Sequence, residues 1–127
     1  MILGGYDYEE PLTKKQRIYQ LLAGFDFAPM LHDYGFALNG VAQYALYLLN
    51  RLYVSDLSID RLISLAAYVI TETASQDGKV GGPVQITTVR SAYGCMELPA
   101  SEIERILAEN RTRSEALRES FFGSRQI

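Results

Sequence analysis

Tryptophan is absent from this 127-residue chain, and cysteine and histidine occur once each. The single cysteine, Cys95, excludes a disulfide within the chain and suits a reducing compartment. We expect Cys95 to be a small core residue of a short apolar strand. His32 has only Asp33 beside it, whereas a metal ion needs several ligands close together. The sequence therefore predicts no metal site and no cofactor.

Long apolar runs are also absent. The longest, Ala45–Leu49 and Leu65–Ile70, are far too short to span a bilayer. The chain start lacks the basic, apolar and small-residue order of a signal peptide. The formal net charge of −3 argues against a general nucleic-acid surface, and the one basic run, Lys14–Arg17, suits a solvated turn. We expect a cytoplasmic protein, or also a nuclear one in a eukaryote, with no membrane or nucleic-acid partner.

What the chain does contain is apolar and aromatic. Hydrophobic residues make up 48% of it, including nine Tyr and five Phe, which favours a packed domain over a disordered chain. Glu9-Glu10-Pro11 has the composition of a turn. Short apolar runs predict three strands in the first third of the chain: Met1–Tyr6, Arg17–Leu22 and Asp33–Leu38.

Helical periodicity dominates the rest of the chain. The helix expected over Val41–Tyr53 is apolar almost all round, which predicts cover on most faces. The next runs to about Gln76, with Ser58 or Ser55-Asp56 as its cap and Asp77-Gly78 as its stop. Strands are expected over Val84–Arg90 and Cys95–Leu98, followed by a helix over Pro99–Phe122 with a Ser101/Glu104 capping box. This order predicts an α+β domain with an antiparallel sheet and helices packed outside it.

The order of these predicted elements, and the turns between them, resemble the C-terminal half of a proteasome-type subunit of the 20S α/β kind, in the N-terminal nucleophile hydrolase superfamily. Five stretches carry the resemblance in the right order: Met1–Asp7, Phe36–Leu52, Leu57–Thr73, Gln76–Val89 and Leu98–Leu107. The resemblance implies two antiparallel sheets face to face with helices outside, an αββα sandwich of which this chain is a half or reduced version. Residues 1–127 would then be one partial domain, with the last helix and tail over 100–127.

The resemblance also implies where catalytic groups would lie. Active members use an N-terminal threonine as nucleophile and its own amine as base, but this chain has no threonine near its start, and Thr13 is expected in a turn. The supporting serine of the glycine turn is replaced by Gly40, and a later hydroxyl residue by Val80. Asp77 keeps the family's aspartate, either as a remnant of the site or as a turn residue. No residue is therefore assigned a catalytic role.

Gly81-Gly82-Pro83 lacks the Lys-Ser/Thr that completes a phosphate-binding loop, so it is interpreted as a tight structural turn.

Three functions remain open on this basis. The first is a non-catalytic proteasome-like subunit or fragment that contributes structurally to a protein-degrading core particle. Its partners would be other such subunits or copies of itself, and the assembly's substrates would be proteins. The second is the C-terminal part of an active threonine-type endopeptidase whose nucleophile lies in another segment. The third is a small self-associating binding domain.

Overall fold

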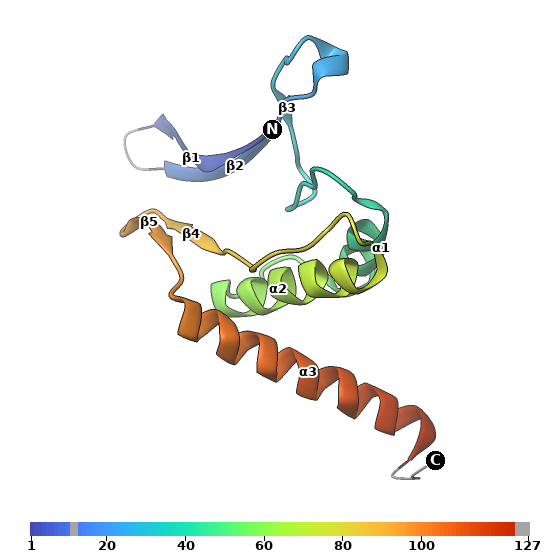
Figure 1. Cartoon of the computed structure of the whole chain (residues 1–127). Coiled ribbons are helices and arrows are strands. Elements are labelled where there is room, and N and C mark those ends of the chain that lie inside the picture. The colour runs from blue at the N-terminus through green and yellow to red at the C-terminus, as the bar shows by residue number, and fades with distance from the viewer. Residues whose placement is uncertain (11–12, 124–127) are drawn as a thin grey trace.

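A computed structural model describes residues 1–10 and 13–123 of the chain. It is an α+β fold with small antiparallel sheets, as the sequence predicts (Figure 1). The elements are, in chain order, β1 (Ile2–Glu10), β2 (Thr13–Gln20), the 3-10 turn η1 (Ala23–Phe25), β3 (Met30–Leu31), α1 (Gln43–Leu52), α2 (Ile59–Gln76), β4 (Thr87–Arg90), β5 (Gly94–Glu97) and α3 (Ala100–Phe122).

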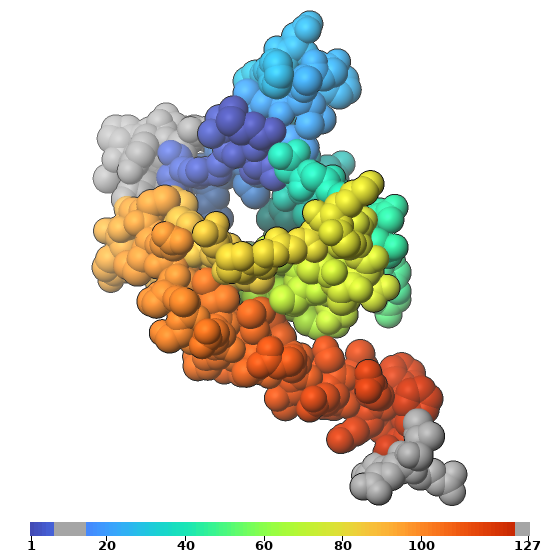
Figure 2. Space-filling view, viewed as in Figure 1, coloured from blue at the N-terminus to red at the C-terminus, as the bar shows by residue number. Residues whose placement is uncertain are grey.

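Two separate antiparallel sheets form one side of the molecule. The first has the order β1-β2-β3, with Ile2 opposite Gln20, and the second is the β4-β5 hairpin, with Thr87 opposite Glu97. Tyr6 bridges them, since its hydroxyl donates to the carbonyl oxygen of Val89 at 3.4 Å. Figure 2 nevertheless shows an opening between the blue and teal N-terminal segments and the yellow segment that precedes β4.

The strand predicted over Asp33–Leu38 is wrong. Pairing with β2 ends at Leu31, and Gly35 has a φ of +84°, which ends an extended run. Phe36 and Leu38 instead pack against the helices around Ala45, Leu49 and Val69. Residues 36–38, which we call the strap, alternate in hydrophobicity as a strand does, but they form an apolar segment that packs across α1 and α2. The turn predicted at Glu9–Pro11 falls partly outside the described residues, and Glu9 and Glu10 belong to β1.

A second hydrophobic core, separate from the one around Ala45, Leu49 and Val69, joins α2 to α3. Ala67, Ile86, Ile103 and Ile106 are its buried members, and Ile63, Val84, Leu98 and Leu107 pack around them. The segment before β4 is held there by the bond from the amide of Leu98 to the carbonyl of Ile86, at 2.8 Å. This core fixes the first half of α3 on α2.

The two predicted helix caps have different outcomes. Ser58 does cap α2, because its hydroxyl accepts from the amide of Arg61 at 3.4 Å. The Ser101/Glu104 capping box is wrong, because Pro99 is the N-cap and its carbonyl accepts from the amides of Glu102 and Ile103. The helix therefore begins before Ser101, whose hydroxyl lies inside the first turn and caps nothing.

Several apolar side chains predicted to be covered are exposed. Tyr47 and Leu52 of α1 are 59% and 47% exposed. Cys95 is exposed as well, so its prediction as a core residue is wrong. The physical reason is the same at both places: no layer of the described chain packs over β5 or over the outer face of α1.

Candidate functional site

Two of the positions that the family resemblance singled out, Gly40 and Val80, line one groove of about 430 Å³, whereas Asp77 does not line it. Asn39, Gly40 and Val41 line it from the segment between the strap and α1, and Lys79, Val80 and Gly81 line it from the loop after α2. Gly40 and Val80 are thus brought together from opposite sides. Gly82, with a φ of +87°, and Pro83 carry the chain on from this loop toward β4.

Asp77 is held in the turn at the end of α2. Its amide donates to the carbonyl of Thr73, and its own carbonyl accepts from the amide of Val80 at 3.0 Å. One carboxylate oxygen accepts from the amide of Lys79 at 2.9 Å. The carboxylate therefore shapes the loop that carries Val80 to the groove.

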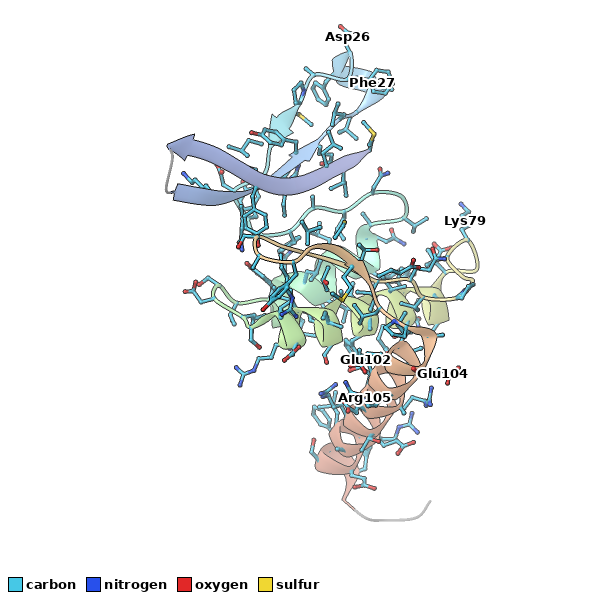
Figure 3. All side chains as sticks on the ribbon, turned by 90° about the vertical axis from the view of Figure 1, so that its left-hand side faces the viewer. Asp26, Phe27, Lys79, Glu102, Glu104 and Arg105 are labelled. Atoms are coloured by element: carbon cyan, nitrogen blue, oxygen red, sulfur yellow. The ribbon has the colours of Figure 1, made fainter. Side chains whose placement is uncertain are left out.

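The groove's side chains offer little for nucleophilic catalysis. Gly40 and Val80 have no hydroxyl. Thr73 is only 3% exposed, and its hydroxyl donates to the carbonyl of Val69 at 2.7 Å. Lys79, which sequence reasoning did not single out, is exposed and projects from the loop (Figure 3). Its position directly after Asp77-Gly78, the expected end of the helix, was the sequence feature that could have identified it. Among the described lining residues, no hydroxyl lies beside a base that would activate it.

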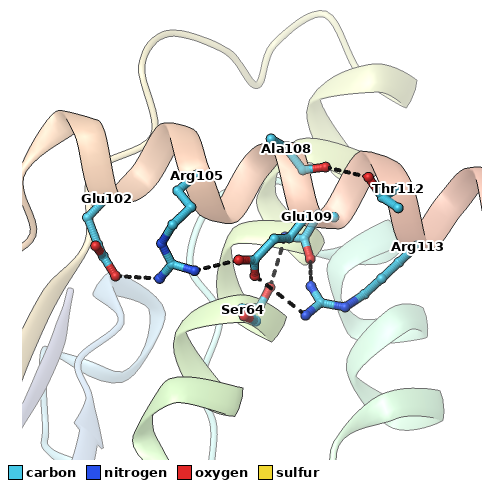
Figure 4. A network of polar contacts seen from close by, with 8 residues as sticks. Ser64, Glu102, Arg105, Ala108, Glu109, Thr112 and Arg113 are labelled. Atoms are coloured by element: carbon cyan, nitrogen blue, oxygen red, sulfur yellow. Dashed lines mark hydrogen bonds and ion pairs between the residues drawn. The ribbon is translucent and has the colours of Figure 1, made fainter.

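A second groove, of about 670 Å³, runs between α2 and α3. A charged ladder follows α3 beside it (Figure 4): Arg105 donates to Glu102 at 2.6 Å and to Glu109 at 2.5 Å. The hydrogen bond and charge of Glu102, and then the charge of Glu109, raise the pKa of the Arg105 guanidinium above its usual range. The ladder is solvent-exposed, so it contributes little to stability.

Asn110 connects the ladder to α2. It is 5% exposed, its amide donates to the carbonyl of Ser64 at 3.1 Å, and its oxygen accepts from Arg113 at 2.5 Å. Helical spacing puts Asn110 on the same face of α3 as Ile103 and Leu107, but it does not indicate these bonds. The spacing of Glu102, Arg105, Glu109 and Arg113 at three and four residues was a readable signal for the ladder.

Neither a metal cluster nor a membrane span is found among residues 1–10 and 13–123. In that part of the chain, no three His, Cys, Asp or Glu side chains gather where they could hold an ion. Its helices likewise do not combine the length and apolar character needed to cross a bilayer. The backbone amide of His32 donates a hydrogen bond to the carbonyl oxygen of Ile18 at 2.8 Å.

Comparison with solved structures finds several chains that share this fold. No protein-family model matches the chain, and no curated protein matches it. An Anbu mutant from Hyphomicrobium sp. strain MC1 superimposes with a TM-score of 0.70 at 20% sequence identity. The chain shares its fold with Anbu. The match covers 99% of this chain and 55% of the Anbu chain, so the chain spans about half the length of that structure.

This finding corrects the family assignment made from sequence. The resemblance named the α- and β-type subunits of the 20S particle, whereas no family model matches and a solved structure that shares the fold is an Anbu mutant. At this identity the likeness concerns the fold alone.

Proposed function

We propose that the chain is a non-catalytic structural component of a proteasome-like assembly that degrades proteins. The observation that carries the proposal is the match to Anbu, which takes in 99% of this chain but 55% of the other. We propose that further polypeptide supplies the remaining part of that fold. The partners are other subunits of the assembly or copies of this chain, and the assembly is placed in the cytoplasm.

The amount of exposed surface supports this dependence on a partner. The chain exposes 9854 Å² to solvent. A compact monomer of 14.2 kDa exposes about 6,800 Å², or about 3,000 Å² less. That excess belongs to one chain, whereas permanent interfaces bury roughly 2,000–5,000 Å² counted over both partners, or about 1,000–2,500 Å² on each. The excess is therefore at least as large as the surface that one partner buries in a permanent interface.

The position of the exposed apolar residues supports it as well. None of the side chains described in β1, β2 and β3 is buried, and Leu3 and Leu31 are 51% and 42% exposed. A twisted sheet normally hides one face against another layer. We propose that the two small sheets are parts of the two larger sheets of an αββα sandwich, in which residues 1–127 form one partial domain and 100–127 its last helix and tail.

The lack of catalytic groups at the groove supports a structural role. The sequence resemblance implies a supporting hydroxyl at the positions of Gly40 and Val80 in active members, and neither residue has one. The hydroxyl of Thr73 is engaged with the backbone, and Asp77 holds a turn. Any peptide-bond cleavage by the assembly would then occur on another chain.

The test is to purify the chain from its own source under native conditions and treat the fraction with a threonine-directed covalent inhibitor. The proposal predicts that this chain elutes at high mass and that inhibitor label appears on other chains. Label on this chain, or elution at the mass of a free monomer, contradicts it.

A further inference from the structure

The outer side of β1 is an unpaired sheet edge. In the order β1-β2-β3, β1 has β2 on one side and no strand of the described chain on the other. Figure 2 shows residues 1–6, in dark blue, at the surface of the molecule. The opposite edge of this sheet is β3, which has only two residues before the chain leaves the sheet. β1 is therefore the edge at which this sheet can grow.

The hydrogen bonds at the start of β1 fix which residues bond to β2. Met1 and Leu21 exchange two bonds, each of 2.9 Å, and so form a hydrogen-bonded pair. Hydrogen-bonded and non-hydrogen-bonded pairs alternate along an antiparallel ladder. Leu3 and Gly5, at every second position of the register, therefore bond to β2 as Met1 does.

The residues between them direct their backbone away from β2. Ile2, Gly4 and Tyr6 occupy the non-hydrogen-bonded positions, so their N–H and C=O groups point to the open side. An independent bond agrees, because Ile18, opposite Gly4, accepts from the amide of His32 on the β3 side of β2. The open edge thus offers donors and acceptors at every second residue, about 6.8 Å apart, a pattern that another extended strand matches.

This edge lacks the usual protection against pairing. Exposed edge strands are normally guarded by charged side chains, by proline or by a bulge. The stretch Ile2–Tyr6 contains no charged residue and no proline, and the irregularity in the β1–β2 register falls later, between Tyr8 and Glu10. Such an edge favours pairing with another chain.

Gly4 and Gly5 point to a close backbone neighbour as well. Glycine weakens a strand, and inside strands it often marks a place where another backbone approaches closely. A Cβ built at either glycine would meet no atom within 4 Å. The described chain therefore gives no reason for these glycines, whereas a strand on the open edge would pass directly beside Gly4.

Building on the proposed function, we propose that this edge binds an extended strand of a separate polypeptide, the one that supplies the rest of the fold. The match takes in 55% of the Anbu chain, so the remainder of such a fold has room for further strands. The bound strand is uncharged and apolar on both faces, because its neighbours are Ile2 on one face and Leu3 on the other, 37% and 51% exposed.

A second copy of β1 fits the edge less well. The antiparallel register that pairs all of Ile2–Tyr6 with its copy is centred on Gly4 and sets glycine against glycine. The open space beside Gly4 and Gly5 then stays unfilled. A strand with side chains at these positions fills it, which favours a separate polypeptide.

Hydrogen exchange at single amides tests the edge, by mass spectrometry with electron-transfer fragmentation. In the isolated chain, Leu3 and Gly5 should exchange more slowly than Gly4 and Tyr6. In the high-mass assembly purified from the protein's own source, Gly4 and Tyr6 should slow by about 10-fold or more, because a strand bonds to them. An assembly in which Gly4 and Tyr6 exchange as in the isolated chain overturns the edge but not the proposed function. Elution as a free monomer overturns both.

A pair of variants at Gly4 tests the same edge by assembly. Gly4→Pro removes an N–H from the open side and no bond to β2, whereas Gly4→Ala keeps that N–H. Gly4 has no positive φ and no atom near its added carbon, so both side chains fit. In the source organism, Gly4→Pro should reduce the share of chain at high mass by about 10-fold or more, and Gly4→Ala should leave it unchanged. Equal assembly of the two variants overturns the proposal, and equal thermal unfolding of the isolated variants controls for folding.

A photoreactive benzophenone side chain in place of Leu3 identifies the occupant. Irradiation of the intact assembly should join this position to a different polypeptide. A link to a second copy of this chain, or no link at all, overturns the choice of occupant.

Discussion

At the scale of single residues, Gly35 is the tightest point that a glycine occupies in the described chain. Its φ is +84°, and a Cβ built there would lie 2.0 Å from the hydroxyl oxygen of Tyr53. Tyr53 in turn packs edge-on against Phe36, with ring centroids 5.4 Å apart. The glycine therefore lets the strap from Phe36 to Leu38 lie against the end of α1.

Gly35→Ala should destabilise the fold by about 2–4 kcal/mol, because it adds both backbone strain and a clash with Tyr53. Gly40→Ala is the matched control, since Gly40 has a φ of +89° but nothing within 4 Å of the added carbon. It should cost only about 1 kcal/mol. Urea unfolding of both variants measures the difference, and equal losses would contradict the role of the Tyr53 contact.

At the scale of elements, the α2–α3 contact holds the C-terminal part of the molecule together. Ile103 is 7% exposed and belongs to the core around Ala67 and Ile86. The exposed ladder from Glu102 to Arg113 lies outside this core. Packing, with the bonds of Asn110, is therefore the main force between the two helices.

Ile103→Ala should lower the free energy of unfolding by about 2–4 kcal/mol, because it leaves a cavity between α2 and α3. Leu62→Ala, at a position of α2 that is 39% exposed, should cost roughly 1 kcal/mol. Thermal unfolding followed by circular dichroism compares the two. A loss at Ile103 no larger than at Leu62 would argue that α3 is not anchored by this core.

The elements also show how far the sequence could predict the fold. The three helices and the α+β class were predictable because their periodicity is local, and Ser58 caps α2 where a cap was expected. The third strand was not, because whether residues 33–38 pair or pack is decided by Tyr53 and the helices, which are distant in sequence. The cap of α3 was missed because Pro99 and Ser101 compete for one helix start.

The candidate site was predictable in its position more than in its contacts. The glycine turn at Gly40 and the loop at Val80 do line one groove. The bond from the amide of Lys79 to Asp77 and the burial of Thr73 depend on the folded turn, so neither could be predicted from local sequence. The α2–α3 groove depends on the crossing of two helices, which no local pattern specifies.

At the scale of the whole molecule, the uneven burial predicts uneven stability. All residues named as buried lie between Ala45 and Asn110, and none of the described side chains of β1–β3 is among them. Segments with few buried contacts open most easily. The β1–β2 hairpin is therefore the part whose stability depends most on a partner.

Hydrogen exchange followed by mass spectrometry should show this directly. In the isolated chain, the amides of β1 and β2 should exchange much faster than those of α2. In the proposed assembly they should become protected, while α2 changes little. A hairpin as well protected as α2 in the isolated chain would mean that the sheet needs no further layer.

The most direct test of the central claim, a non-catalytic part of a larger proteasome-like assembly, is native mass spectrometry of material purified from the protein's own source. The account predicts a large complex that releases this chain together with other subunits or further copies of the chain. A free monomer, or a homodimer that is part of no larger complex, would contradict it.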